Sequence, residues 1–327
     1  MSELIILTEA GGSVGFGHLM RCQAISNYAS AKLYVHPDGV CPINSDIIIY
    51  PWRTNIENLI EELPLKSTLL IDSYLADISV FEALSSKFDC VAVIDDFDRL
   101  IYPVDLIINP GIQIPAYDKQ IAKVVSGKDY VILRDEMVRH VVKDNYDEYR
   151  NLLVTFGGSD ASRIYNWLLP LLANHKNFIV NIVTGNDSYG TILAKQFNQP
   201  NINWLGTVDA THMANLMYQS DICISAGGQT LHELAYIGVP TICVETGADQ
   251  INNIEGYLSL GFVIEKLKIE MTDLPVKINE CLKKYSSKVL RTDIAMKGKN
   301  IVDGNGVIRI VDIVQTYSKE KLCRDMK

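Results

Sequence analysis

Residues 8–21, TEAGGSVGFGHLMR, carry four glycines and a histidine between a strand pattern and a helix pattern. The apolar run LIILTEA (4–10) predicts a short buried strand, and HLMRCQAISNYAS (18–30) has the spacing of a helix. A strand that passes through glycines into a helix is typical of parallel α/β folds, in which ligands bind at the carboxyl ends of strands. The glycine-rich loop is therefore the first place to look for a functional site.

Strand and helix patterns alternate along the rest of the chain in two series. Further strands of the first series are expected at residues 31–36, 46–50, 67–74, 89–96, 105–110 and 130–137. Strands of the second series are expected at residues 152–160, 178–185, 202–206, 221–228, 239–245 and 261–266. The polar stretch 142–151 between the two series is the best linker candidate.

Two successive βα series predict an α/β protein of two Rossmann-like parallel-sheet domains with helices on both faces of each sheet. We expect the domains to cover residues 1–147 and 148–327. The final amphipathic segment, 306–322, is expected to be a helix, and it could pack back on the first domain.

Composition and charge argue against several classes of protein. The net charge of −9 argues against nucleic acid or an anionic membrane as the main partner. No apolar run approaches the roughly 20 residues of a membrane span, and the start MSELIILTEA lacks the basic region of a signal peptide. The seven cysteines are scattered without a CxxC pair, which is typical of reduced, buried thiols. We therefore expect a cytoplasmic protein.

The loop GGSVGFGH (11–18) has three possible roles: a catalytic loop, a phosphate cradle or a turn that needs glycine. Its glycine order, G-x-x-G-x-G, differs from the dinucleotide fingerprint G-x-G-x-x-G, although Asp38 follows the second strand at a suitable distance. His18 stands at the start of the helix, where the dipole favours a neutral imidazole that can accept a proton. A surface histidine after a tight turn is the alternative interpretation.

Two further loops follow expected strands of the second domain. FGGSD (156–160) could receive a phosphate or merely start a helix. SAGGQTLHELAYIGVP (225–240) leads into a helix whose N-terminus suits a diphosphate, and Glu233 could accept hydrogen bonds from ribose hydroxyls or compensate the helix dipole. TGADQINN (246–253) is rich in side chains that hydrogen-bond sugar hydroxyls.

The chain resembles the PseG/SpsG family, whose fold is the GT-B fold of two Rossmann-like domains facing a central cleft, as in MurG-like glycosyltransferases. The specific elements are GFGHLMRC (15–22) and VDGNG (302–306). Other matching segments run along nearly the whole chain: 69–74, 93–99, 108–111, 130–137, 154–160, 224–240 and 297–310. The resemblance implies UDP-2,4-diacetamido-2,4,6-trideoxy-β-L-altropyranose hydrolase activity in pseudaminic acid biosynthesis, with a link to surface glycans such as flagellin glycosylation.

The resemblance also implies roles for individual residues. His18 matches the histidine that deprotonates or orients the attacking water, and Tyr74 matches a tyrosine beside the sugar. Substrate-binding positions would be Gly15, Gly17, Arg21, Asp72, Gly157, Gly158, Ser225, Gly227, Gly228, Gln229, Thr230, Glu233, Asp249 and Gln250. The chain departs from the family in two places: Asp72-Ser73-Tyr74 replaces Asp-His-Tyr, and Asp249-Gln250 replaces Asn-Gln.

Hydrolysis of a UDP-sugar also has a physical basis. UDP is a good leaving group, and helix N-termini can stabilise its charge without a metal or other cofactor. Attack by water opposite UDP would invert the anomeric centre. The alternatives are a glycosyltransferase with the same donor site and a nucleotide-sugar-binding protein without turnover. The expected partners are a UDP-sugar and UDP, with the protein a monomer or weak homodimer.

Overall fold

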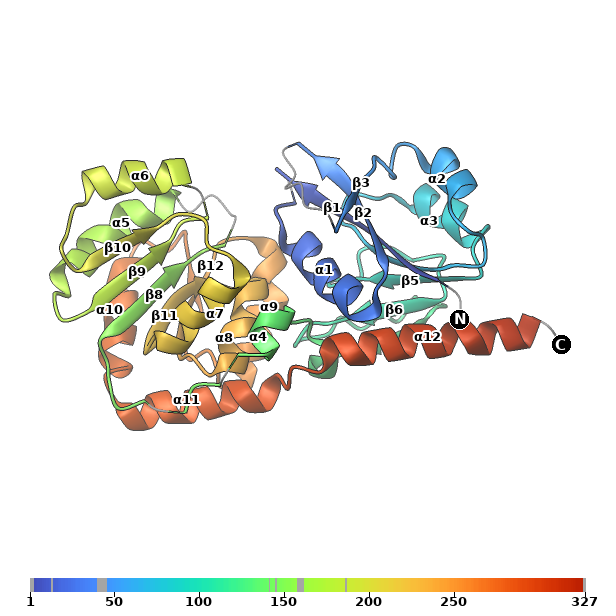
Figure 1. Ribbon diagram of the computed structural model, residues 1–327. Coiled ribbons are helices and arrows are strands. Elements are labelled where there is room, and N and C mark those ends of the chain that lie inside the picture. The colour runs from blue at the N-terminus through green and yellow to red at the C-terminus, as the bar shows by residue number, and fades with distance from the viewer. Residues whose placement is uncertain are drawn as a thin grey trace. The chain divides into compact units, whose positions relative to one another are not determined.

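The computed structural model describes residues 3–12, 14–39, 46–140, 142–144, 146–157, 162–185 and 187–325 (Figure 1). The chain forms two compact units. The first combines Met1–Arg134 with Gly304–Lys327, and the second is Asp135–Asp303. Each unit is built on one sheet, and every strand pair in both sheets is parallel.

The first sheet has the strand order β3-β2-β1-β4-β5-β6-β7. The elements of this unit are β1 (Leu4–Gly11), α1 (Gly17–Ala29), β2 (Lys32–Asp38), β3 (Ile48–Ile49), α2 (Ile56–Glu62), β4 (Thr68–Asp72), α3 (Ile78–Ser85), β5 (Cys90–Ile94), β6 (Leu106–Asn109), β7 (Lys123–Ser126), η1 (Lys128–Tyr130) and α12 (Gly306–Asp325). Leu4 and Ile6 of β1 pack on one face, Ile5 and Leu7 on the other. Both faces are therefore covered, which explains why the strands read as continuous apolar runs.

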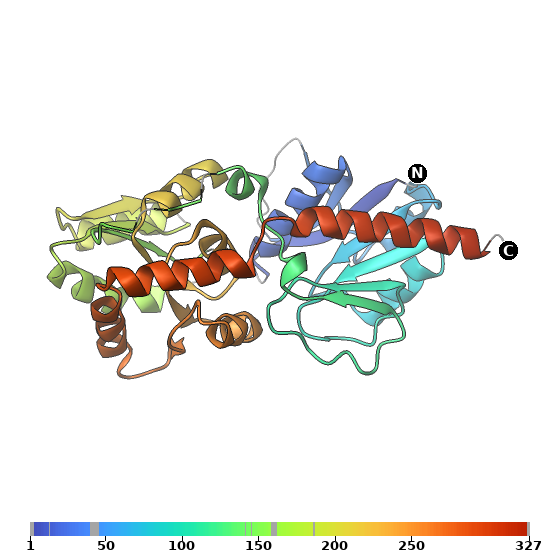
Figure 2. The same cartoon turned by 90° about the horizontal axis from the view of Figure 1, so that it is seen from below.

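The helix α12 belongs to the first unit although it follows the whole second unit in the chain. Figure 2 shows it lying along the first sheet. Val307, Ile310, Val311 and Val314 form its apolar stripe and join the core that α1 also covers. Within the same interface the buried Thr68 hydroxyl donates to Ser318 Oγ at 2.7 Å. The first sheet therefore depends on a helix that is distant in sequence.

The second sheet has the strand order β10-β9-β8-β11-β12-β13. The elements of this unit are α4 (Asp135–Val138), β8 (Asn151–Thr155), α5 (Ser162–Asn174), β9 (Ile179–Val183), α6 (Asp187–Gln196), β10 (Ile202–Leu205), α7 (Ala210–Gln219), β11 (Ile222–Ala226), α8 (Gln229–Ile237), β12 (Thr241–Glu245), η2 (Ala248–Gln250), α9 (Ile251–Ser259), β13 (Leu267–Lys268), α10 (Leu274–Lys284) and α11 (Lys288–Ile301).

Two strands predicted from apolar runs are wrong. Residues 130–137 form no strand, and the last strand of the first sheet is β7, whose sequence KVVS is short and only partly buried. Residues 261–266 likewise form no strand, and the edge strand is β13. Ile132 and Phe262 are nevertheless buried, because these runs pack as loops against their cores. An apolar run indicates burial, but it does not by itself show that the run pairs with a neighbouring strand in a sheet.

The segment after Arg134 packs with the second unit. Lys143 Nζ donates to Ser220 O at 2.6 Å and pairs with Asp221 at 3.0 Å, and the Tyr146 hydroxyl donates to Gly238 O at 3.0 Å. The units thus divide at Arg134 and again at Asp303, whereas the first boundary was expected after residue 147 and the last helix was expected to be able to pack back on the first domain.

Each sheet has one position where the direction of strand progression reverses. In the first sheet it lies between β1 and β4, and in the second between β8 and β11. The loops that leave neighbouring strands at such a point diverge to opposite faces and leave a crevice at the carboxyl edge. The glycine-rich loop after β1 and the loop after β11 both lie at these positions, which places them where parallel α/β proteins bind ligands.

Candidate active site

The loop between β1 and α1 is closed by its own backbone. Gly11 N donates to Gly15 O at 3.0 Å, and Gly15 N donates to Gly11 O at 2.7 Å. A Cβ on Gly11, which has φ +137°, would lie 1.8 Å from Asp38 O, so only glycine fits. The tight loop brings the chain into α1 at Gly17, and His18 lies in the first turn.

His18 is held by Asp72, the last residue of β4. The His18 Nδ1 atom lies 2.7 Å from Asp72 Oδ1, and Asp72 has no exposed surface. Burial alone would raise the pKa of Asp72, but the Arg21 guanidinium and the hydrogen bonds from Arg21 and His18 outweigh it and hold that pKa well below its usual range. Because an ionised carboxylate only accepts, Nδ1 carries the proton, and in the neutral imidazole the lone pair is then on Nε2. This arrangement leaves His18 with a base atom that makes no hydrogen bond within the described residues.

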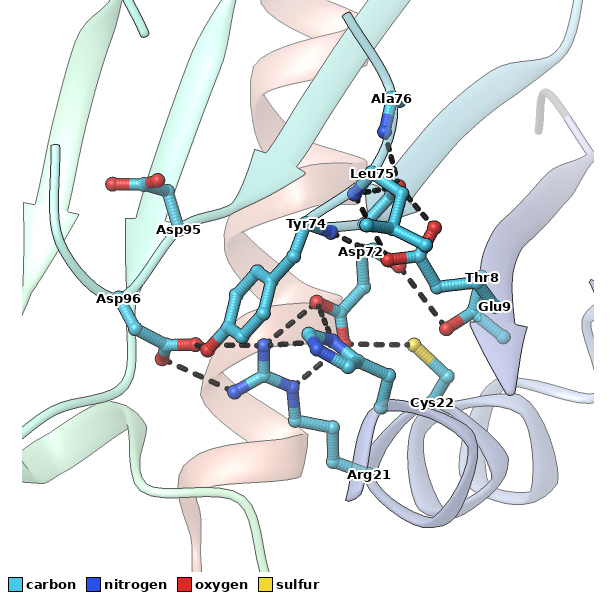
Figure 3. A network of polar contacts seen from close by, with 12 residues as sticks. Thr8, Glu9, Arg21, Cys22, Asp72, Tyr74, Leu75, Ala76, Asp95 and Asp96 are labelled. Atoms are coloured by element: carbon cyan, nitrogen blue, oxygen red, sulfur yellow. Dashed lines mark hydrogen bonds and ion pairs between the residues drawn. The ribbon is translucent and has the colours of Figure 1, made fainter. Parts of the chain in front are cut away.

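Arg21 connects Asp72 to a second carboxylate, Asp96. Its Nε donates to Asp72 Oδ2 at 2.6 Å and its Nη2 to Asp72 Oδ1 at 2.7 Å. Nη1 and Nη2 also donate to Asp96 at 3.1 and 2.9 Å, as Figure 3 shows. Burial disfavours the charge, yet Asp72 and Asp96 raise the pKa of Arg21 well above its ordinary value. Arg21 is therefore a permanent cation between two carboxylates.

Tyr74 stands beside the imidazole. Its ring meets that of His18 edge to face, with centroids 4.1 Å apart and an interplanar angle of 88°. Its hydroxyl donates to Asp96 Oδ2 at 2.5 Å (Figure 3). Burial and then the neighbouring Asp96 raise the pKa of Tyr74 well above its ordinary value, so the phenol stays protonated.

Glu9 of β1 shapes the loop that carries Tyr74. This fully buried carboxylate accepts from Ser73 Oγ at 2.5 Å, from Tyr74 N at 2.6 Å and from Leu75 N at 3.1 Å. Ser73 stands where the resemblance expects a histidine. Its hydroxyl donates a hydrogen bond to Glu9 inside the fold. Sequence reasoning missed both Glu9 and Asp96. The available signals were a single carboxylate within the apolar run LIILTEA and the Asp pair that ends VIDD.

The side chain of Gln250 holds the loop after β11 in the second unit by a hydrogen bond. The side-chain oxygen of Gln250 accepts from Gly227 N and Thr246 N, each at 3.1 Å. A Cβ on Gly227 would lie 2.4 Å from Ile254, so the backbone passes too close for any other residue. Gly228 then precedes α8 without a side-chain cap. The positive end of this helix dipole suits an anion.

The other predicted positions fall at the carboxyl edges or beneath them. Asp249 is exposed in η2, Thr230 is half-buried in the first turn of α8, and Glu233 is buried in the same helix at 1% exposure. The remaining residues divide as follows: Gly15, Gly17, His18, Arg21, Asp72 and Tyr74 gather in the first unit, whereas Gly157, Ser225, Gly227, Gly228, Gln229 and Gln250 belong to the second, and Gly158 lies outside the described residues.

Arg21 and Asp72 were expected to bind substrate directly, but both are buried and their contacts support His18. Gln250 is also buried, and its amide is used to tie two loops together. Within the described ranges no three His, Cys, Asp or Glu side chains are grouped as a metal site requires. No helix among the described residues is long and apolar enough to cross a membrane.

Comparison with known proteins shows what the chain is similar to. Residues 152–303 match the glycosyltransferase family 28 C-terminal domain. The spore coat polysaccharide biosynthesis protein SpsG of Bacillus subtilis is 23% identical over 97% of this chain and 99% of its own length. The pseudaminic acid cytidylyltransferase and UDP-2,4-diacetamido-2,4,6-trideoxy-β-L-altropyranose hydrolase of Helicobacter pylori is 25% identical over 78% of this chain and 47% of its own length.

The chain is thus similar to SpsG along nearly its whole length and to the Helicobacter pylori enzyme over most of it. Solved structures confirm the GT-B fold that the family resemblance predicts. MurG of Acinetobacter baumannii matches with a TM-score of 0.66 at 16% identity, covering 96% of this chain and 99% of that protein. The UDP complex of Staphylococcus aureus MnaA matches with a TM-score of 0.68 at 12% identity, covering 97% of each chain. At these identities the likeness concerns the fold alone.

Proposed function

We propose that this protein, like the PseG/SpsG proteins it resembles, is a UDP-sugar hydrolase that releases UDP and a free diacetamido-trideoxy sugar for pseudaminic acid synthesis. The observation that carries the proposal is the Asp72–His18 pair at the switch point of the first sheet. It holds an imidazole with Nδ1 protonated and Nε2 ready to accept a proton. The hydrolase activity in the name of the Helicobacter pylori relative supports the same reaction.

The reaction is a single displacement. A water oxygen forms a bond to the anomeric carbon while the bond from that carbon to the phosphate oxygen breaks, and UDP leaves with the electron pair. His18 Nε2 takes a proton from the attacking water. UDP needs no strong general acid, because the diphosphate is stable as an anion. Attack from the side opposite UDP gives inversion at the anomeric carbon.

The charges beneath His18 favour this proton transfer. Arg21 contributes one positive charge, and Asp72 and Asp96 contribute one negative charge each, so the three groups together carry a net charge of −1. When His18 accepts the proton it becomes an imidazolium next to this net negative charge. A preformed arrangement of charge that complements the charge developing in the transition state lowers the barrier.

The nucleotide is assigned to the second unit. The open space at Gly228, where an added Cβ would meet nothing within 4 Å, and the start of α8 there without a side-chain cap support a diphosphate site. Glu233, further along α8, is proposed to meet the ribose. The match of this unit to a glycosyltransferase family domain supports a donor site of the same kind.

The first test is the His18→Asn variant. We expect UDP release from UDP-2,4-diacetamido-2,4,6-trideoxy-β-L-altropyranose, with no acceptor present, to fall by about 100- to 10,000-fold, the usual contribution of a positioned general base. UDP binding, measured by calorimetry, should persist, because the nucleotide contacts lie in the other unit. The matched control is His212→Asn, which changes an exposed histidine on α7.

Three other outcomes would contradict the proposal. Unchanged release in His18→Asn would mean that His18 is incidental, as in a protein that only binds nucleotide sugars. Weakened UDP binding at an unchanged maximal rate would indicate that the loop of residues 11–18 binds phosphate. Release that requires an added sugar acceptor would indicate a glycosyltransferase.

The second test concerns metal dependence. We expect UDP release to persist in excess EDTA, because helix N-termini are proposed to carry the charge of the leaving group. Loss of activity in EDTA that magnesium or manganese restores would show that this account of the leaving group is wrong.

A further inference from the structure

Asp96 follows β5, next to β4 in the sheet, and its carboxylate meets both Tyr74 and Arg21. We propose that Asp96 is a positioning residue. It accepts the hydrogen bond from the Tyr74 hydroxyl, so that the Tyr74 oxygen can only accept a hydrogen bond from the attacking nucleophile. In this way the site selects water over an alcohol. This inference rests on the proposed hydrolase function. Asp96 does not need to touch the substrate, because it acts through Tyr74 and Arg21.

The Tyr74 hydroxyl can only accept a further hydrogen bond, because it has a single O–H group. A phenol has one proton to donate, and that proton is directed at Asp96 Oδ2 over 2.5 Å. The carboxylate is fixed from the other side by two bonds from Arg21, so it cannot turn away without losing them. What the Tyr74 oxygen still offers is a lone pair. Tyr74 is therefore not a proton donor to the leaving group.

His18 is also a hydrogen-bond acceptor, but for a different reason. Its Nδ1 proton is directed at Asp72, which leaves the lone pair on Nε2. The two rings are in edge contact, with centroids 4.1 Å apart. The pair thus presents two hydrogen-bond acceptors, one on each of two adjacent rings, and no donor.

Two acceptors select a nucleophile that carries two donors. Water can donate one O–H to His18 and the other to Tyr74, and its remaining lone pairs are then free to attack. A sugar hydroxyl has only one O–H and would leave one acceptor without a partner, which is costly in a desolvated site. The arrangement therefore favours hydrolysis over transfer to a sugar.

The neighbouring Asp95 provides a matched structural control. Its carboxylate also accepts from tyrosine hydroxyls, Tyr102 at 2.8 Å and Tyr117 at 2.7 Å, but it is 2% exposed and lies within the fold. Figure 3 shows that the side chains of Asp95 and Asp96 point apart. The Tyr102→Phe variant removes a comparable hydrogen bond without touching the His18–Tyr74 pair.

The decisive experiment measures nucleophile choice. The substrate UDP-2,4-diacetamido-2,4,6-trideoxy-β-L-altropyranose is turned over in water–methanol mixtures, and the ratio of methyl glycoside to free sugar is measured. We expect wild-type protein and Tyr102→Phe to give nearly only free sugar. Asp96→Asn and Tyr74→Phe should raise the share of methyl glycoside several-fold and lower kcat by about 10- to 100-fold, the usual effect of losing an orienting partner.

A double-mutant cycle adds a second criterion. If Asp96 acts partly through the Tyr74 hydroxyl, the combined variant should lose less activity than the product of the two single losses. Strictly multiplicative losses together with an unchanged product ratio in both single variants would overturn the proposal, because that pattern describes a structural role only. Retained UDP binding shows that each variant is folded.

A third measurement does not depend on turnover, so it separates this inference from the proposed function. In the proton NMR spectrum of ligand-free protein, a short hydroxyl–carboxylate bond gives a resonance far downfield. We expect one such signal to vanish in Tyr74→Phe and to move upfield in Asp96→Asn, but to persist in Tyr102→Phe. A protein that releases no UDP yet shows this pattern would refute the hydrolase assignment and keep the Tyr74–Asp96 bond. A spectrum that is unchanged in both variants would refute the inference.

Discussion

At the scale of single residues, the most sensitive position is Asp72. In Asp72→Asn the amide can donate to His18 Nδ1, which shifts the imidazole proton to Nε2 and removes the base. We expect kcat to fall by about 1,000- to 10,000-fold, as when an orienting carboxylate is lost from a catalytic dyad. Arg21 would also lose one of its two carboxylate partners and keep Asp96, so a loss of up to about 3–5 kcal/mol in unfolding free energy should accompany it.

The control for Asp72→Asn is Cys22→Ala. This change removes the thiol contact to Asp72 Oδ2, which measures 3.4 Å, and one buried sulfur atom from the core, but it leaves the His18–Asp72 and Arg21–Asp72 contacts in place. We expect a small loss of stability and a kcat close to that of wild-type protein. Steady-state kinetics and urea denaturation of both variants make the comparison, and equal kcat values would refute the orienting role of Asp72.

His36 should make stability depend on pH. Burial, followed by the nearby Arg53, lowers the pKa of His36 from 6.5 to about 4, against the opposing effect of Asp38. The neutral Nδ1 accepts from Arg53 N at 3.1 Å. Between about pH 6.5 and 4 the unfolded chain therefore binds a proton that the folded protein does not. The stabilisation is complete above pH 6.5 and is lost as pH falls, by roughly 2–3 kcal/mol.

The check is urea denaturation between pH 7 and pH 4. We expect His36→Asn, which keeps an acceptor for the Arg53 amide, to lose less stability over this range than wild-type protein. His212→Asn, on the exposed face of α7, should retain the wild-type slope. Identical slopes for all three proteins would show that His36 does not titrate as described.

The sequence located His18 and Tyr74 because a family motif contains them. It did not show which partner each acidic residue holds in place. Asp72 holds the imidazole, Asp96 holds the phenol and Glu9 holds a loop, although all three read as carboxylates near strand ends. Their partners depend on β1, β4 and β5 being neighbours, and that order is set by the fold rather than by sequence proximity.

At the scale of elements, the turn from β11 into α8 is the best test of packing. A methyl group on Gly227 would lie 2.4 and 2.5 Å from two carbon atoms of Ile254 in α9. We expect Gly227→Ala to cost about 1–3 kcal/mol in unfolding free energy, because the two elements must move apart. UDP affinity should fall with it if this turn receives the diphosphate.

Gly228→Ala is the matched control, since an added methyl group there meets nothing within 4 Å and the backbone φ is −83°. Its unfolding free energy should stay within about 0.5 kcal/mol of wild type. Urea denaturation and UDP calorimetry of the two variants separate packing from binding. Equal stabilities would argue against the close contact at Ile254.

Helices, central strands and the edge strands β3 and β10 were predictable, but the other two edge strands, β7 and β13, were not. The run 130–137 is more apolar than KVVS at 123–126, yet only the latter extends the first sheet. Edge strands are often very short and carry charged side chains such as Lys, which hinder further strand pairing, so they leave only a weak apolar pattern. The long run is instead buried as loop and short helix, and periodicity cannot distinguish these outcomes over such short lengths.

At the scale of the whole molecule, α12 makes the first unit depend on distant sequence. Ile310 is fully buried in the core that α12 shares with α1. We expect Ile310→Ala to cost about 2–5 kcal/mol, and the loss should fall on the first unit. Fluorescence of Trp52, buried in that unit, reports it when Trp167 and Trp204 are replaced by phenylalanine. Ile308→Ala, at a position that is 38% exposed on the same helix, is the control and should cost little.

The position of α12 also has a consequence for biosynthesis. Strands β1–β7 are translated first, but the helix that covers one of their apolar faces is translated after the entire second unit. At about 5–20 residues per second, the 193 residues from 135 to 327 leave that face covered by α1 but not by α12 for roughly 10–40 s. The second unit, encoded without interruption, can fold during this interval. The order of completion is then the reverse of the order of synthesis, and nascent first units are the species that a ribosome-associated chaperone would have to shield.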